Sequence, residues 1–359
     1  MAAMLLSSTM FSVCMAGNRA QKTNLSKGGT SNCYIVSDAG RYEFRADVKG
    51  NSGIPVGGTP ASAELLWEAD GFGKHADGRL IKASSVVLDG SYVSFSTAVP
   101  FTDGNALIAV RDASGTILWS WHIWICKGFN PDATAQDYAN SAGLVMDRNL
   151  GACSATVGEA KAAGLHYQWG RKDPFPPCTN NSAAAGNVIS GKDNLAYSIA
   201  NPSVFIYGDA WPFDWYCEDC ENRNDTLWSS EKSVYDPCPA GWRVIDGDIG
   251  GVWCKAFGNT YYDWSYAGDW DEAGKGMNFA ATYNKMGPGP VIWYPAAGSR
   301  DNLSGKLQGV GDHGYYWSAT PAYTGASCLC FFYFNTTAPS CHLSRSYGLS
   351  VRCQRETGK

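Results

Sequence analysis

Seven short β-rich runs between residues 33 and 126 constrain the fold of this 359-residue chain more than any other feature. They recur about every ten residues with Gly, Asp or Pro between them, a spacing typical of an all-β sandwich. Alternation along the last run assigns two faces, one with Trp119, Trp121, Ile123 and Ile125 and the other with Ser120, His122 and Trp124. We therefore interpret His122 as a sheet histidine with a hydrogen-bond partner, not as a catalytic group.

Composition changes divide the chain into three parts. Residues 1–32 are interpreted as an N-terminal tail or the remnant of a signal peptide, and residues 33–130 as the β-sandwich domain. A polar segment at 127–141 predicts a boundary, and residues 140–357 form the second domain. In that domain we expect two short helices, near 155–164 and 250–258. Long irregular stretches between them need aromatic packing or disulfides to hold them.

Charge and cysteine content restrict the environment and the partners. A net charge of −5 leaves no basic surface for nucleic acid, so we expect no nucleic-acid partner. No run of 18 apolar residues occurs, so no transmembrane segment is expected. Thirteen cysteines indicate an extracellular or cell-surface location with disulfides. Zinc is an alternative only at Cys217 and Cys220, which have ligand spacing.

Five ordered motifs in the second domain resemble a known family. They are VMDRNLG at 145–151, YQWGRKD at 167–173, YDPCPAGWR at 235–243, YWS at 316–318 and YGLSVRC at 347–353. Together they resemble the Fibrobacter succinogenes major paralogous domain. The preceding β-rich region, from residue 32 to residue 124, is similar to the β domain found before it in surface proteins of gut Bacteroidetes.

The resemblance implies an α+β chain, in which an all-β sandwich precedes a C-type-lectin-like domain. That fold, shared with formylglycine-generating enzymes, has a small twisted sheet, two helices and long loops. Ile245 departs from the family pattern, which usually has Pro there. An early and a late cysteine commonly close such domains, so the resemblance implies a disulfide between Cys238 and Cys353.

One cysteine pair and two acidic loops are the candidates for enzyme chemistry or metal binding. Cys328 and Cys330 lie two apart, and on a strand they suit a soft metal such as copper better than a disulfide. The oxidase motif of the formylglycine-generating enzymes is not found around them, however, and no nucleophile-elbow motif occurs. Acidic loops with Asp246 and Asp248, or with Asp269, Asp271 and Glu272, leave calcium open. We expect no enzyme activity and no cofactor, with calcium as the alternative.

Residues 321–350 contain the strongest candidate for a binding face. The run 327–335 reads as a strand with Leu329, Phe331 and Tyr333 inward, which would expose Cys328, Cys330, Phe332 and Phe334. The alternative is that both faces are buried. The window lacks Lys, Glu, Gln, Met and Trp, and every residue in it can be encoded by a codon ending in a pyrimidine. That composition resembles the variable region of proteins diversified by retroelements.

These patterns predict an adhesin-type protein that binds a protein or carbohydrate ligand on another cell or host surface. The expected ligand-binding residues are Tyr323, Ser327, Cys328, Cys330, Phe332, Phe334, Ser340, His342, Ser344 and Ser346. Two alternatives remain open: a structural subunit of a surface or pilus assembly, and a cysteine- or copper-dependent oxidase. The sequence leaves the oligomeric state and the anchoring route open.

Overall fold

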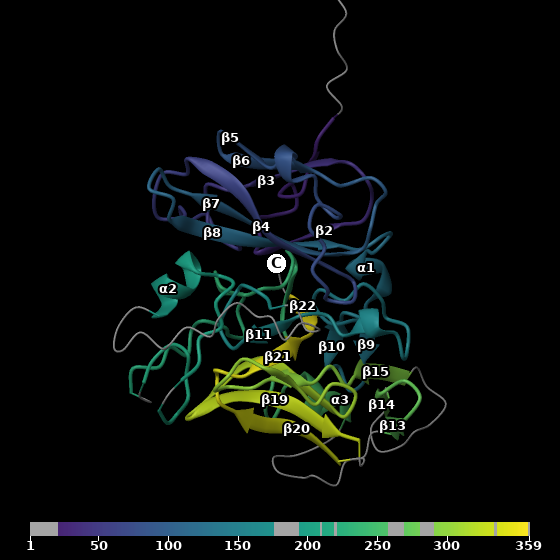
Figure 1. Ribbon diagram of the computed structural model, residues 1–359. Helices are drawn as coiled ribbons and strands as arrows, with labels where there is room; N and C mark the ends of the chain where they lie inside the picture. The colour runs from purple at the N-terminus through teal and green to yellow at the C-terminus, as the bar shows by residue number, and fades with distance from the viewer. Residues whose placement is uncertain are drawn as a thin grey trace, which may run out of the picture.

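The computed structural model describes residues 21–175, 194–208, 210–218, 221–257, 269–280, 291–333 and 336–357. Figure 1 shows a β-sandwich at the top of the view and a larger C-terminal part below it. The sandwich strands are β1 (Thr23–Asn24), β2 (Cys33–Val36), β3 (Arg41–Arg45), β4 (Ser62–Asp70), β5 (Val87–Asp89), β6 (Tyr92–Ser96), β7 (Gly104–Arg111) and β8 (Ile117–Ile125).

Where the C-terminal part is described, it combines short strands with three short helices. The helices are α1 (Pro131–Thr134), α2 (Asn194–Ala200) and α3 (Val252–Phe257). The strands are β9 (Gln136–Tyr138), β10 (Gly143–Val145), β11 (His166–Gln168), β12 (Trp242–Val244), β13 (Asp269–Asp271), β14 (Gly276–Ala280), β15 (Val291–Pro295), β16 (Ser299–Arg300), β17 (Leu307–Gln308), β18 (His313–Ala322), β19 (Gly325–Phe332), β20 (Thr336–Leu343), β21 (Gly348–Val351) and β22 (Cys353–Arg355).

Two four-stranded sheets form the sandwich, in the orders β1-β3-β6-β5 and β2-β8-β7-β4. Between them lies an apolar core to which β8 contributes Trp119, Trp121, Ile123 and Ile125, the face that alternation predicts. The predicted run at 80–88 is strand only over β5, because a 3-10 turn at Ala83–Ser85 precedes it. The other six runs each contain one strand of the sandwich, so the expectation of β-rich structure here is confirmed.

The folded chain begins earlier than expected. Strand β1 pairs in parallel with β3, with Thr23 opposite Tyr42. Ser31 and Asn32 are buried, and the Ser31 hydroxyl donates a hydrogen bond to the carbonyl of Cys238 at 3.0 Å. The interpretation of 1–32 as a tail is therefore wrong for residues 21–32, because these residues complete the sandwich and contact the C-terminal part. Residues 1–20 lie outside the described residues.

The second face of β8 packs against the C-terminal part. The Trp124 indole donates to the carbonyl of Ala152 at 3.1 Å, and the Ser120 hydroxyl donates to Asp173 at 2.7 Å. His122 is buried, and its Nε2 lies 2.8 Å from Oδ1 of Asn105, which agrees with its interpretation as a sheet histidine. One apolar cluster contains Trp124, Cys126 and Phe129 together with residues of the C-terminal part. The two parts therefore share a core.

Three sheets organise the C-terminal part. Their orders are β12-β22-β10-β9, then β17-β16-β21-β18-β19-β20 with β11 paired to β21, and finally β13-β14-β15. The first of these already includes β9, so the sheet structure begins at Gln136, before the expected start at 140. Most of the described secondary structure is β, and the helices are few and short.

The two expected helices have different outcomes. Helix α3 falls inside the predicted 250–258 segment, and residue 258 lies outside the described residues. The 155–164 segment forms only a 3-10 turn at Ala160–Ala162, so that prediction is wrong. Gly158 adopts a positive φ of 79° and Glu159 is extended, and this backbone interrupts any helix. Helix α1 was not expected; it begins after Asn130, whose side chain accepts a hydrogen bond from the Asp132 amide at 3.0 Å.

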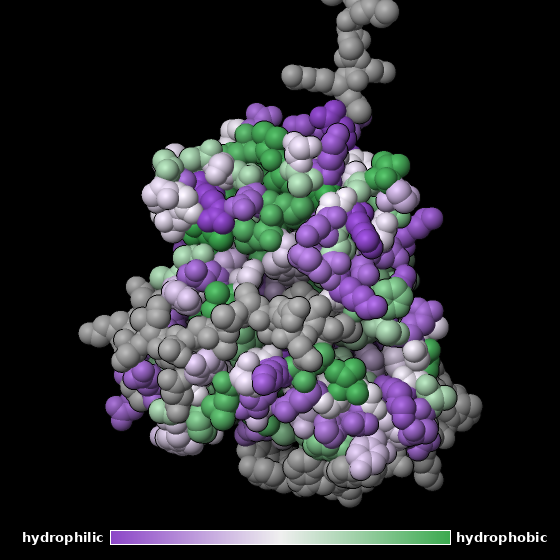
Figure 2. All heavy atoms as spheres, in the orientation of Figure 1, coloured by the Kyte–Doolittle hydropathy of each residue, from purple (hydrophilic) through white to green (hydrophobic). Residues whose placement is uncertain are grey.

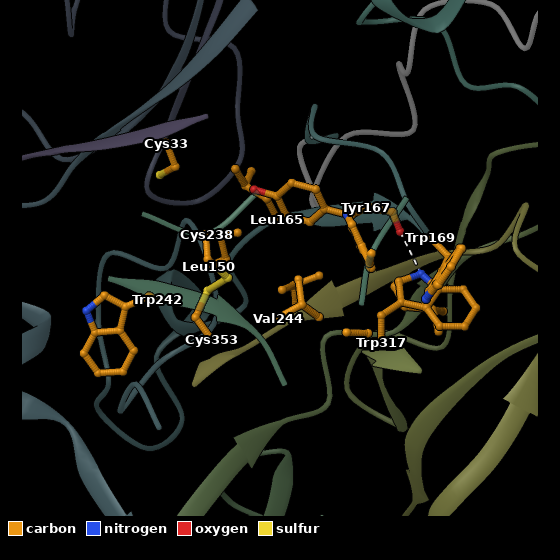
Figure 3. Packing of buried hydrophobic residues seen from close by; sticks show 14 of the residues in the cluster. Cys33, Leu150, Leu165, Tyr167, Trp169, Cys238, Trp242, Val244, Trp317 and Cys353 are labelled. Carbon is orange, nitrogen blue, oxygen red and sulfur yellow. Dashed lines mark hydrogen bonds between the residues drawn. A yellow bond between two sulfur atoms is a disulfide. The ribbon is translucent and has the colours of Figure 1, made fainter. Parts of the chain in front are cut away.

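A disulfide joins Cys238 to Cys353 within the shared core, with an S–S distance of 2.02 Å. The pairing implied by the family resemblance is thus present, and it links residues 115 apart in sequence. Figure 3 shows it beside Trp242, Val244 and Leu150, with the Trp317 indole donating to the Tyr167 carbonyl at 2.9 Å. Within the described ranges, no helix is long and apolar enough to cross a membrane.

Candidate functional site

Strands β18, β19 and β20 carry most of the residues expected to bind a ligand. In the β18–β19 hairpin, His313 lies opposite Phe332, Tyr315 opposite Cys330, and Trp317 opposite Cys328. These six side chains share one face because successive residues of a strand point to opposite sides. Strand β20 continues that face, with Cys341 opposite Cys328. The other face carries Tyr316, Leu329 and Phe331.

Most of β19 is buried on both faces. Leu329 and Phe331 belong to an apolar cluster with residues of α3, β14 and β15. Cys328 packs in the shared core, and both Cys328 and Cys330 are at most 1% exposed. The expectation of two outward thiols is therefore wrong, and the alternative with both faces buried holds for this segment. Tyr333, expected inward, is 54% exposed because it follows the last residue of β19.

Three of the serines that were expected to bind a ligand are buried. Ser327 and Ser346 are fully buried, and Ser340 is 5% exposed. A Cβ added to Gly247 would lie 2.8 Å from the Ser327 hydroxyl, so the loop before α3 is pressed against this strand. None of these three hydroxyls is available to an external ligand in this conformation. Ser344 is half-buried, and Phe334 lies outside the described residues.

An aromatic cluster lies at the end of the hairpin where β18 begins and β19 ends. The rings of His313 and Phe332 are 5.1 Å apart, those of Tyr315 and Phe332 are 5.8 Å apart, and those of His313 and Tyr315 are 6.1 Å apart. All three side chains are half-buried. The Tyr333 amide donates to the Asp312 carbonyl at 2.9 Å, which places the exposed Tyr333 beside the start of β18. We call His313, Tyr315, Phe332 and Tyr333 the aromatic end.

Tyr323 lies at the opposite end of the same hairpin. It is 68% exposed at the tip between β18 and β19, with the Arg223 guanidinium 5.0 Å from its ring centre. Strand β18 has ten residues, and a strand rises about 3.4 Å per residue, so Tyr323 and Phe332 are roughly 30 Å apart. The structure therefore does not bring the two predicted aromatic contacts into one patch.

Three cysteines meet beside the aromatic end. A bulge in the β19–β20 ladder between Cys328 and Cys330 lets both thiols hydrogen-bond to Cys341. These two hydrogen bonds lower the pKa of Cys341 to about 4, whereas burial raises the pKa of Cys328. Cys341 is half-buried. Only the pairing of β19 with β20 brings Cys341 to the other two cysteines, and strand pairing is not visible in the sequence.

Asp248 organises a polar group on the other face of β20. The Ser340 hydroxyl donates to Oδ1 of Asp248 at 2.5 Å, and Nε2 of His342 lies 3.4 Å from the same oxygen. Asp248 occupies the loop before α3 with a positive φ of 63°. A hydrolytic Ser-His-Asp relay has the imidazole in the centre, whereas here the carboxylate is central. This arrangement positions β20 against the loop and does not prepare a nucleophile.

The acidic loops considered for calcium have protein partners. Both carboxylate oxygens of Asp246 accept hydrogen bonds from Arg243, at 2.6 and 2.5 Å. Asp271 accepts the Gly274 amide at 2.9 Å, and Glu272 pairs with Lys275. Across the described residues, no three His, Cys, Asp or Glu side chains are placed to hold a metal ion. The zinc alternative at Cys217 and Cys220 cannot be traced, because Cys220 lies outside those residues.

Figure 2 shows hydrophilic and hydrophobic residues mixed over the lower half of the molecule, with no single hydrophobic area covering that face. Compared with known proteins, the chain matches no family model, no curated protein and no solved structure. The family resemblance therefore stays a prediction, and function is argued from the geometry.

Proposed function

We propose that this chain is an extracellular ligand-binding protein of the adhesin type, with its recognition face at the aromatic end. The observation that carries the proposal is the cluster of His313, Tyr315 and Phe332, which is half-buried on regular strands. Rings fixed by a sheet offer contact area at low entropy cost, as aromatic residues do in antibody paratopes. Tyr333, which follows Phe332 in the chain, adds an exposed ring next to this cluster.

The partner class is a protein or carbohydrate on another cell or host surface. Aromatic faces suit the apolar faces of sugars, and Tyr and Phe are common anchors in protein interfaces. The position of the cluster supports this proposal, because Leu329 and Phe331 beneath it are fully buried and fix the strand. An extracellular location is supported by the Cys238–Cys353 disulfide, since such bonds persist in oxidising compartments.

The test is binding of the purified full chain to arrayed host glycans and to cultured epithelial cells. Phe332→Ala should reduce binding at least tenfold, because it removes the ring that contacts both His313 and Tyr315. Phe72→Ala is the matched control, since Phe72 is an exposed ring of the sandwich. Equal binding by both variants, with unchanged thermal midpoints, would contradict the proposal. Loss of assembly instead of binding would favour the structural-subunit alternative.

Retroelement diversification is proposed only for the accessible part of 321–350. Residues buried on both faces of β19 tolerate few substitutions, because core volume changes cost stability. Variation should therefore concentrate at Phe332, Cys341, His342 and Ser344, which are half-buried. Sequencing the gene across closely related isolates tests this expectation. Substitutions spread evenly over buried and accessible positions would contradict it.

A further inference from the structure

Two cysteines from different parts of the chain share one small gap at the junction. Cys126 directly follows β8, and Cys153 lies in the loop after Leu150. The Cys126 sulfur is 3.7 Å from the carbonyl oxygen of Cys153, and the Cys153 sulfur is 3.7 Å from the carbonyl oxygen of Ile125. Each thiol therefore lies against the backbone that carries the other.

Hydrogen bonds hold both backbones in place around this gap. The Trp124 indole donates to the Ala152 carbonyl at 3.1 Å, and the Asn105 amide group donates to the Gly151 carbonyl at 2.9 Å. The Cys126 amide donates to the Val36 carbonyl at 2.9 Å. The main chain is thus held on each side, and each sulfur already lies against the backbone beside the other cysteine, so the proposed bond calls for rotation of the two side chains.

Arg148 supplies a positive charge beside the pair. Its Nη1 lies 3.6 Å from the Cys126 sulfur, while Nε and Nη2 donate to Asp147 at 2.8 and 2.9 Å. Its guanidinium also lies 4.0 Å from the ring centre of Phe129. The hydrogen bond from the Cys153 thiol and the Arg148 charge lower the pKa of Cys126. A thiolate is the nucleophile in disulfide exchange, so this environment favours reaction.

From this geometry we propose that Cys126 and Cys153 form a second disulfide, which covalently links the sandwich to the C-terminal part. The oxidant is a low-molecular-weight disulfide such as oxidised glutathione. It reaches Cys153, which is half-buried, whereas Cys126 is buried. The Cys126 thiolate accepts the proton of the Cys153 thiol, whose own pKa is raised by that hydrogen bond and by burial. Cys153 attacks one sulfur of the oxidant and releases one thiolate, which then takes the proton from Cys126. Cys126 then attacks the mixed disulfide at the Cys153 sulfur and releases the second thiol. Two protein thiols are oxidised and one disulfide is reduced to two thiols.

The experiment uses the full chain in a glutathione redox buffer, followed by alkylation under denaturing conditions and peptide mapping by mass spectrometry. We expect a cross-linked peptide pair joining Cys126 to Cys153, and an unfolding midpoint about 5 °C above that of the reduced pair. Cys126→Ser and Cys153→Ser should each abolish both effects. Cys254→Ser, at a cysteine in α3, is the matched control and should leave the cross-link in place.

Arg148→Gln tests the rate of disulfide formation separately from which cysteines are joined. It should slow cross-link formation at pH 7 several-fold without changing which cysteines are joined. The mapping itself needs only the unmodified chain, so a misfolded variant does not obscure the result. The proposal is overturned if Cys126 and Cys153 are both still alkylated after the redox buffer has reached equilibrium, or if either is found joined to another cysteine.

Discussion

The sandwich and the C-terminal part are stabilised in different ways. The sandwich has an apolar core between two four-stranded sheets, and its few buried polar side chains include Glu68, Asn105 and His122. The C-terminal part buries many charged side chains, among them Arg171, Lys172, Asp173, Asp214, Asp236, Arg300, Arg345 and Arg352. Both parts pair strands over long sequence distances, β2 with β8 in the sandwich and β18 with β21 in the C-terminal part.

The difference shows how each part obtains a unique structure. Alternating apolar residues define the inner faces of the sandwich strands, including strands that pair over long sequence distances, such as β2 with β8. In the C-terminal part, loops are held by specific polar contacts and by a covalent bond. Lys232, for example, is buried and donates to the carbonyls of Cys238 and Pro239. Changes to polar groups should therefore cost more in the C-terminal part than in the sandwich.

Removal of the disulfide gives the largest expected difference between the two parts. For the double variant Cys238→Ser and Cys353→Ser, the chain-entropy model predicts a loss of about 5 kcal/mol, since the closed loop spans 115 residues. Hydrogen exchange should show lost protection in β12, β21 and β22, while the inner strands β6 and β7 stay protected. Equal loss of protection in both parts would contradict the claim that the two parts are stabilised in different ways.

Breaking a buried ion pair should have the next largest effect. Arg345 is buried, lies 3.6 Å from Asp214, pairs with Asp225, and donates to the Gly325 carbonyl at 3.0 Å. Arg345→Met leaves Asp214 buried without this partner and should lower the free energy of unfolding by about 3–5 kcal/mol. The control is Arg111→Met in the sandwich, whose exposed pair with Glu64 should contribute about 0–1 kcal/mol. Similar losses in urea unfolding would contradict the account.

Acid should destabilise both parts through one buried histidine in each. Burial lowers the pKa of His122 and of His166 to about 3. The unfolded chain binds these protons below about pH 6.5, so stability is full above that pH and falls as the pH decreases toward 3. Each histidine should cost about 2 kcal/mol at pH 5. Burial raises the pKa of Asp214 to about 6, which offsets part of this loss.

His122→Asn and His166→Asn separate the two contributions. Unfolding free energies at pH 7 and pH 5 should differ less in each variant than in the unmodified chain. The difference between the two pH values is the quantity of interest, so a general destabilisation by the substitution does not affect it. A variant that keeps the full acid loss would show that its histidine is not the group responsible.

The last expected effect concerns the reactivity of Cys341 rather than stability. Its pKa of about 4 depends on hydrogen bonds from Cys328 and Cys330. Alkylation of Cys341 by iodoacetamide should therefore already be fast at pH 6. In a double variant, Cys328→Ala and Cys330→Ala, the rate at pH 6 should fall at least tenfold, because a free thiol has a pKa near 8.5. Identical pH profiles would contradict the thiol cluster.

Local patterns in the sequence were sufficient for much of the sandwich. The alternation of Trp119 and Trp121 with Ser120 and His122 placed both faces of β8 correctly, since burial on a sheet follows a period of two. The 3-10 turn before β5 and the pairing of β1 were missed, because neither has an alternating pattern. The Cys238–Cys353 pairing came from the family resemblance and not from the spacing of the cysteines.

The candidate site was less predictable because its contacts are long-range. Asp248 meets Ser340 across 92 residues, and no local pattern joins them. Burial of Cys328 and Cys330 follows from the elements that cover both faces of β19, which the alternation of a single strand cannot show. His313 and Tyr315 alternate with Gly314 and Tyr316 in β18, a signal that was present in the sequence. Their contact with Phe332 required the register of the hairpin.

Binding by two hairpin variants tests the central claim most directly. Phe332→Ala and Tyr323→Ala each remove one ring, at opposite ends of β18–β19, and the full chain can be compared on the same epithelial cells. If recognition lies at the aromatic end, Phe332→Ala reduces binding at least tenfold, whereas Tyr323→Ala retains most of it. Loss of binding with Tyr323→Ala alone would place the recognition face at the other end and contradict the account.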